Sequence, residues 1–134
     1  MKITSISGSP KNQHSASSRL ADEFKTMLPG EIEYNFLKWC RPHFNTGDID
    51  DFFATDAVVF FFPLYVDGIP AHLLKLLQEL EVLARTHSER SRPTIYAVVN
   101  CGFFEGGQAH LALDMMRNWC CRAGLTWGMG LGLG

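Results

Sequence analysis

A short polar segment near the amino terminus has the composition of a phosphate-binding loop. It covers residues 8–18, with the sequence GSPKNQHSASS, and combines four serine hydroxyls with the cation of Lys11. Hydroxyls and free backbone N–H groups at a helix start donate hydrogen bonds to phosphate, and the helix dipole favours negative charge there. The segment matches neither a Walker loop nor a GxGxxG fingerprint. It is equally typical of an ordinary turn in which Ser15, Ser17 or Ser18 only caps the next helix.

Two further segments combine aromatic side chains with proline or glycine. In residues 63–69, PLYVDGI, Tyr65 is suited to stack on a flat heterocycle, or to lie half-buried with its hydroxyl in water. Residues 100–107, NCGFFEGG, pair Phe103 and Phe104 with glycines, which permit close approach of the backbone to a ligand. The alternative is that this segment is simply the packed entry to a helix. None of the three segments alone distinguishes a ligand site from an ordinary turn. Their expected placement along one edge of the sheet is what favours a ligand site.

The other groups capable of chemistry favour structural roles. His14 and His110 have no carboxylate ligands at a suitable spacing and the cysteines form no CxxC pair, so no metal site is expected. Cys101 has no resolving partner nearby in the sequence, which favours packing over redox chemistry. Cys120 and Cys121 should place one thiol inward and one outward on a helix. The residues expected on the surface or in a solvated turn are His43, His72, His87, Asp48, Asp50 and Asp51.

Strands and helices that must position these segments alternate along the chain. Apolar and β-branched runs predict strands at 3–7, 32–39, 58–62, 94–99 and 125–133. Apolar residues at helical spacing predict helices over 20–28, 70–84 and 112–123, with Gly124 as the residue that ends the last one. The run at 58–62 is apolar at every position, as in a strand buried on both faces, whereas 32–39 alternates and suits an edge.

This order predicts a single α/β domain over residues 1–134, with a parallel, doubly wound sheet. Ligands of such sheets bind beyond the carboxyl ends of the strands, where the strand order reverses. The three polar segments at 8–18, 63–69 and 100–107 all follow strands, so we expect them to meet at that edge.

The composition limits the classes of function. A formal net charge of −2 leaves no basic surface for nucleic acid. The longest apolar run, 57–66, is far shorter than the roughly 20 residues that span a bilayer, so no membrane association is expected. The first residues lack the apolar core of a signal peptide, and the cysteines show no disulfide framework. A cytoplasmic location is the expectation.

The three segments together resemble the NAD(P)H-dependent FMN reductase family of the flavodoxin-like superfamily, over nearly the whole chain. The resemblance implies a strand order of 2-1-3-4-5 and FMN as cofactor. The residues that it assigns to the FMN phosphate loop are Ser9, Lys11, Ser15, Ala16 and Ser17, with Ala16 standing where many relatives carry a polar residue. The residues that it places around the isoalloxazine ring are Pro63, Leu64, Tyr65, Val66, Asn100, Gly102 and Phe103.

The function implied is that of an oxidoreductase that passes electrons from NAD(P)H through FMN to a quinone, a flavin or another small acceptor. The chemistry would take place at flavin N5, so no side chain is assigned as catalytic. Two alternatives remain: an electron carrier of the flavodoxin type, and a flavin-free interaction protein that retains the fold. A charge of −2 fits poorly with a carrier, which gains from a strongly acidic surface.

The last predicted strand, 125–133, has consequences for assembly. Flavodoxin-like domains usually continue into a final helix, and no such helix follows here. A parallel sheet is normally covered on both faces, so apolar residues near Trp127, Met129 and Leu131 should lack cover. We therefore expect a homodimer or larger homo-oligomer that buries this flank, or else a chain shortened from a longer protein.

Overall fold

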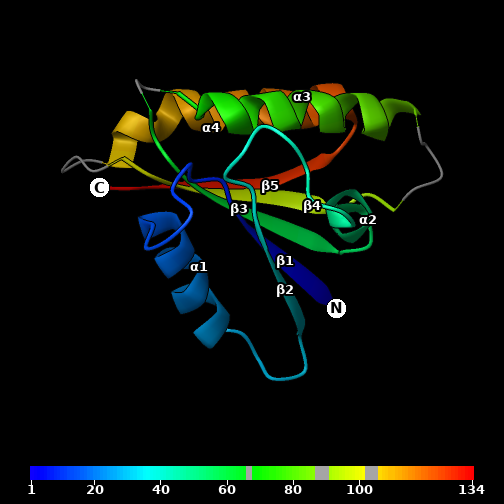
Figure 1. Ribbon diagram of the computed structural model, residues 1–134, viewed down its shortest axis with the longest axis horizontal. Helices are drawn as coiled ribbons and strands as arrows, with labels where there is room; N and C mark the ends of the chain where they lie inside the picture. The colour runs from blue at the N-terminus through cyan, green and yellow to red at the C-terminus, as the bar shows by residue number, and fades with distance from the viewer. Residues whose placement is uncertain (66–67, 87–90, 102–105) are drawn as a thin grey trace.

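The described part of the chain forms five strands and four α-helices, which alternate from the first strand onward (Figure 1). The computed structural model describes residues 1–65, 68–86, 91–101 and 106–134. The elements, in chain order, are β1 (Lys2–Ser7), α1 (Ala16–Thr26), β2 (Glu33–Lys38), α2 (Asp48–Phe53), β3 (Ala57–Pro63), α3 (Ala71–Thr86), β4 (Thr94–Asn100), the short 3₁₀ helix η1 (Gly106–Ala109), α4 (His110–Ala123) and β5 (Thr126–Leu133). None of the described helices is long and apolar enough to cross a membrane.

All five strands are parallel, and their order in the sheet is β2-β1-β3-β4-β5. This confirms both the fold class and the strand order expected from the sequence. The chain first moves outward from β1 to β2, then returns past β1 to β3 and continues in the other direction. The order therefore reverses between β1 and β3, which places the expected binding edge at the loops after these two strands.

Helices cover the two faces of the sheet unequally (Figure 1). The larger core lies beneath α3, α4 and α2, and includes Phe60 and Phe62 from β3. The smaller core lies beneath α1 and includes Val59 and Phe61 from the same strand. Alternate residues of β3 thus enter opposite cores, which explains why this strand is apolar at every position.

Two local predictions differ from the structure. Helix α1 begins at Ala16 rather than near Leu20, because the Ser15 side chain accepts a hydrogen bond from the Ser18 N–H and caps the helix. The expected solvated turn at 48–51 is wrong, since these residues begin helix α2. Asp48 is buried, and its carboxylate accepts hydrogen bonds from Trp39 Nε1 and from the Asn45 N–H, both at 3.0 Å. A carboxylate that is satisfied in this way can remain buried.

The α1 face of the sheet carries an open apolar groove beside that helix. Met129 and Leu131 of β5 are 61% and 51% exposed there. Gly128 permits the close approach of the Tyr96 ring, because a Cβ at this glycine would lie 2.4 Å from the ring. Among the described residues no helix covers this part of the face. The cavity has a volume of about 410 Å³, and its lining includes Ile3, Phe24, Val59, Tyr96, Met129 and Leu131.

Candidate functional site

The three segments that follow β1, β3 and β4 meet at the carboxyl edge of the sheet. The Gly8 N–H donates to the Phe61 carbonyl at 2.8 Å, which joins the first loop to β3. The Leu64 N–H donates to the Asn100 carbonyl at 3.0 Å, which joins the second loop to the end of β4. The Ser17 hydroxyl donates to Asn100 Oδ1 at 3.1 Å, which links the first loop directly to the third. Contacts between residues as many as 83 positions apart thus assemble one site.

The serine hydroxyls of the first loop hold the loop in shape. Ser9 Oγ accepts from the Lys11 N–H at 3.2 Å, and Ser15 Oγ accepts from the Ser18 N–H at 3.0 Å. The Ser15 hydroxyl donates to Ser18 Oγ at 2.9 Å. The side chains of Ser9, Ser15 and Ser17 are all buried. The helix cap and the expected phosphate loop are therefore the same segment, because Ser15 caps α1 from within that loop.

Free backbone donors remain in this loop. From Asn12 to Ser17, six consecutive N–H groups donate to no acceptor in the described part of the chain. His14 has a φ of +54°, and a left-handed residue in such a run is typical of backbone concavities that bind anions. The run leads into the amino terminus of α1, where the helix dipole favours negative charge. Lys11 and Ala16 are exposed beside it. The arrangement fits a phosphate group.

The start of this loop is packed firmly against the protein. Gly8 lies so near α3 that a Cβ there would be 2.6 Å from Leu73 Cδ2 and 3.3 Å from Phe62 Cβ. Only glycine fits such a position without a shift of its neighbours. The close packing anchors the loop where it leaves β1, so its free N–H groups are presented from a fixed base.

The second loop presents an aromatic ring at the same edge. Tyr65 is 44% exposed, whereas Pro63 and Leu64 are half-buried. The Tyr65 and Gly68 backbones exchange two hydrogen bonds, at 3.0 and 2.9 Å. This exposure leaves the ring free to stack on a flat ligand. Val66, which belongs to the expected site, lies outside the described residues.

Of the third loop, the structure describes the first residues, Asn100 and Cys101. Asn100 is half-buried, and its carbonyl and side-chain oxygens accept the two contacts given above. Cys101 donates from both its N–H and its Sγ to the Leu133 carbonyl, at 3.0 and 3.2 Å. The Cys101 thiol is therefore engaged with the end of β5, as expected for a packing role. Gly102 and Phe103, the other expected site residues here, lie outside the described residues.

Other residues singled out in the sequence lie apart from this edge or have structural partners. His72 is half-buried, with Nε2 at 2.8 Å from the Trp39 carbonyl, and His43 is exposed. His110 Nδ1 lies 3.0 Å from the Gly107 carbonyl. Cys120 is buried and Cys121 exposed, as predicted, and burial raises the pKa of the Cys120 thiol to about 12. His87 lies outside the described residues.

Sequence reasoning missed the basic side chains beside the first loop. Lys38 ends β2, and its Nζ donates to the Asn12 carbonyl at 2.8 Å. Arg19 extends from α1, and Arg41 follows β2; both are exposed. The parallel pairing of β1 with β2 places the end of β2 next to the first loop. An overall charge of −2 conceals this local excess of cations. The implied strand order 2-1-3-4-5, which places the end of β2 beside the first loop, was the signal that could have revealed it.

Known structures share this fold at low sequence identity. A WrbA-like flavodoxin from Agrobacterium tumefaciens is 13% identical, with a TM-score of 0.74 over 95% of this chain and 76% of that one. An apo NADH:FMN oxidoreductase is 17% identical, with a TM-score of 0.68 over 96% of this chain and 74% of that one. General stress protein 14 of Treponema denticola, in complex with FMN, is 11% identical, with a TM-score of 0.67 over 96% and 83%. No protein-family model and no curated protein matches the sequence.

Proposed function

We propose that the chain binds FMN and transfers electrons from NAD(P)H to a small acceptor such as a quinone or a flavin. The observation that carries this proposal is the run of six N–H groups from Asn12 to Ser17, which donate to no acceptor among the described residues and lead into α1 beside two further loops at the same sheet edge. Solved structures with this fold include an NADH:FMN oxidoreductase and an FMN complex, which supports the choice of ligand.

The first loop would hold the phosphate. Its N–H groups from Asn12 to Ser17 donate hydrogen bonds, and Lys11 adds a positive charge in solvent. The buried hydroxyls of Ser9, Ser15 and Ser17 would not contact the phosphate directly. Their role would be to hold the backbone of the loop in place. These roles require no rearrangement of the serines.

The second and third loops would hold the ring. Tyr65 offers an exposed aromatic face, while Pro63 and Leu64 give a partly buried apolar wall. The contact between Leu64 and Asn100 holds the two loops at one spacing. Bound FMN supplies hydride and electron transfer, and the protein supplies position and exclusion of water. Val66, Gly102 and Phe103 enter the proposal on the sequence alone.

Visible absorption titration of the purified protein tests the proposal. FMN should bind at least about a hundredfold more tightly than riboflavin, because charge-assisted hydrogen bonds to the phosphate contribute roughly 1.5–3 kcal/mol each. The loaded protein should then be reduced by NADPH or NADH under anaerobic conditions. Equal affinity for the two flavins would exclude the phosphate site. Binding of FMN with no reduction by either nucleotide would favour an electron carrier, and no binding of either flavin would favour an interaction protein.

A further inference from the structure

One side-chain hydrogen bond joins the loop that would hold the phosphate to the loop that would hold the ring. The Ser17 hydroxyl, in the first turn of α1, donates to Asn100 Oδ1 at the end of β4, at 3.1 Å. Strand β3 lies between β1 and β4 in the sheet, so the first and third loops leave strands that are two spacings, or roughly 10 Å, apart. The pair therefore bridges the end of β3 and does not merely continue a contact between neighbouring strands.

The two side chains meet on the α1 face of the sheet. Tyr96 and Val98 of β4 pack against the smaller core beneath α1. Because side chains alternate along a strand, Asn100 lies on that same face, where it reaches the first turn of the helix. Ser17 is fully buried, and a buried hydroxyl requires a partner. Asn100 Oδ1 is the acceptor that the Ser17 hydroxyl has among the described residues.

Asn100 is held on the side of the second loop as well. Its carbonyl oxygen accepts a hydrogen bond from the Leu64 N–H at 3.0 Å. The next residue, Cys101, donates from its N–H to the Leu133 carbonyl of β5, also at 3.0 Å. Asn100 is thus fixed to the sheet and to the second loop, and its side chain fixes Ser17 to both. The Ser17 N–H, in turn, is one of the six that donate to no acceptor among the described residues.

We propose that the Ser17–Asn100 pair sets the spacing between the phosphate subsite and the ring subsite. This rests on the proposed function, because it concerns how FMN is held. FMN carries its phosphate and its ring on one ribityl chain, so both ends bind at full strength only when the two subsites are at the matching distance. A site that already has this distance loses less free energy on binding, and the second end binds at a high effective concentration once the first is held. In this role Ser17 and Asn100 are positioning residues.

Three probes distinguish this role from a purely local one. FMN occupies both subsites, lumiflavin carries the ring without the ribityl phosphate, and inorganic phosphate carries only the anion. Flavin fluorescence titration measures the first two, and competition with FMN at constant ionic strength measures the third. The test variant is Ser17→Ala, which keeps the backbone N–H and suits a helix. The matched control is Thr55→Val, which removes another buried hydroxyl, one that donates to the Lys2 carbonyl at the opposite edge of the sheet.

The Ser17→Ala variant should bind FMN about three- to tenfold more weakly than the wild type, the effect of one lost hydrogen bond. It should keep the wild-type affinities for lumiflavin and for inorganic phosphate, because each of these occupies one subsite only. The Thr55→Val control should bind all three probes like the wild type. A loss of phosphate affinity as large as the loss of FMN affinity would show that Ser17 acts on the first loop alone. That result would overturn the inference, and so would a matching loss of lumiflavin affinity.

A double-mutant cycle assigns the effect to the pair. The Asn100→Ala variant should also bind FMN more weakly, and the addition of Ser17→Ala to it should cause no further loss, because the partner of the hydroxyl is already absent. Additive losses would show that the two side chains act independently and would overturn the inference.

The same titrations separate this inference from the proposed function. If the wild type binds no FMN, the proposed function is wrong and the inference fails with it. If the wild type binds FMN more tightly than lumiflavin and Ser17→Ala binds FMN equally well, the inference alone is wrong and the proposed function stands.

Discussion

At the scale of single residues, the donors that the first loop would offer to a phosphate belong to its backbone rather than to its serine side chains. Ala16 is the first residue of α1, so its N–H belongs both to the loop and to the helix start. Ser15 before it has φ −82° and ψ 149°, an extended conformation that a following proline tolerates. Proline is also favoured at the first position of a helix. A single N–H can therefore be removed here while the helix is retained.

The substitution Ala16→Pro should weaken FMN binding by about tenfold or more, the effect of one lost hydrogen bond to a charged group. Circular dichroism should show unchanged helix content. The control is Ala16→Ser, which keeps the N–H and should bind FMN like the wild type. Flavin titration measures both variants. Equal affinity in the proline variant would show that this N–H does not face the phosphate.

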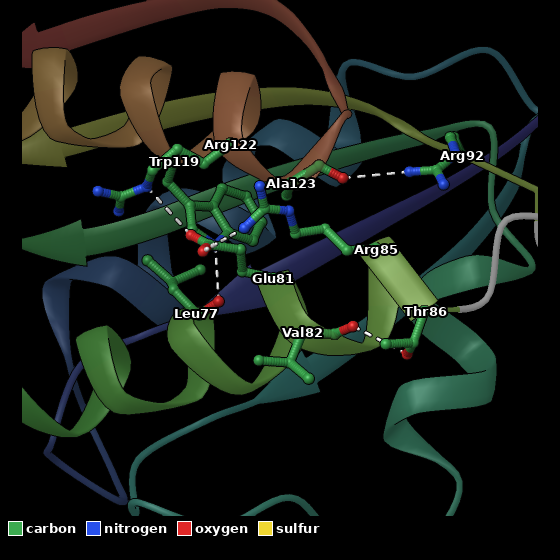
Figure 2. A network of polar contacts seen from close by, with 9 residues as sticks. All are labelled: Leu77, Glu81, Val82, Arg85, Thr86, Arg92, Trp119, Arg122 and Ala123. Atoms are coloured by element: carbon green, nitrogen blue, oxygen red, sulfur yellow. Dashed lines mark hydrogen bonds and ion pairs between the residues drawn. The ribbon is translucent and has the colours of Figure 1, made fainter.

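At the scale of elements, several polar contacts join α3 to α4, among them the exposed pair of Arg122 with Glu81 (Figure 2). Near their carboxyl ends, Arg92 donates to the Ala84, Ala123 and Gly124 carbonyls at 2.8, 3.1 and 3.3 Å. Deeper in the pair, Trp119 Nε1 donates to the Leu77 carbonyl at 2.6 Å. A guanidinium on helix-end carbonyls satisfies acceptors that the helices leave open, and its charge complements the helix dipoles.

The substitution Arg92→Met should lower the free energy of unfolding by about 1–2 kcal/mol, because three carbonyl contacts are lost while the aliphatic stem is kept. The matched control is Arg122→Met, which removes only the exposed 3.1 Å pair with Glu81. We expect the control to change stability by about 0.5 kcal/mol or less. Urea denaturation measures both. If the two variants lose the same stability, Arg92 contributes no more than a surface ion pair.

At the scale of the whole molecule, the apolar groove on the α1 face is unusual for a parallel sheet, which is normally covered on both faces. Strand β5, which contributes Met129 and Leu131 to this groove, is the edge of the sheet. In the described structure it has no partner strand on its outer side. An apolar surface adjoining a strand edge favours association. The expected homodimer remains a prediction, and this surface is where we propose that it forms.

Light scattering should therefore give a mass of at least twice 15.0 kDa at micromolar concentration. The substitution Met129→Lys should reduce the mass to that of a monomer, because it places a charge in the groove. The control is Val82→Lys on α3, where the side chain is 59% exposed, close to the 61% of Met129. A monomeric wild type would contradict the prediction, and so would dissociation caused equally by both substitutions.

Much of the fold was predictable because it depends on local patterns. The apolar run of β3, the helical spacing in α3 and α4, and the turn residues between them are read from neighbouring positions. Alternation of strands and helices then requires a parallel sheet with its loops at one edge. That geometry brought the segments at 8–18, 63–69 and 100–107 together before any contact was known. The sequence pattern by itself thus determined the α/β class and the sheet edge at which the three segments meet, while the strand order was implied by the family resemblance.

Only the tertiary structure decided how individual polar groups are used. Asp48 was expected in water, but Trp39 brings an indole N–H to it across a turn and the carboxylate is buried. Ser17 faces Asn100 rather than the open loop, and Lys38 faces the carbonyl of Asn12. In each case the partner comes from another element, and its direction depends on packing that local periodicity does not encode. Long-range pairing therefore decides which donors remain free for a ligand, and in this protein those are the backbone N–H groups.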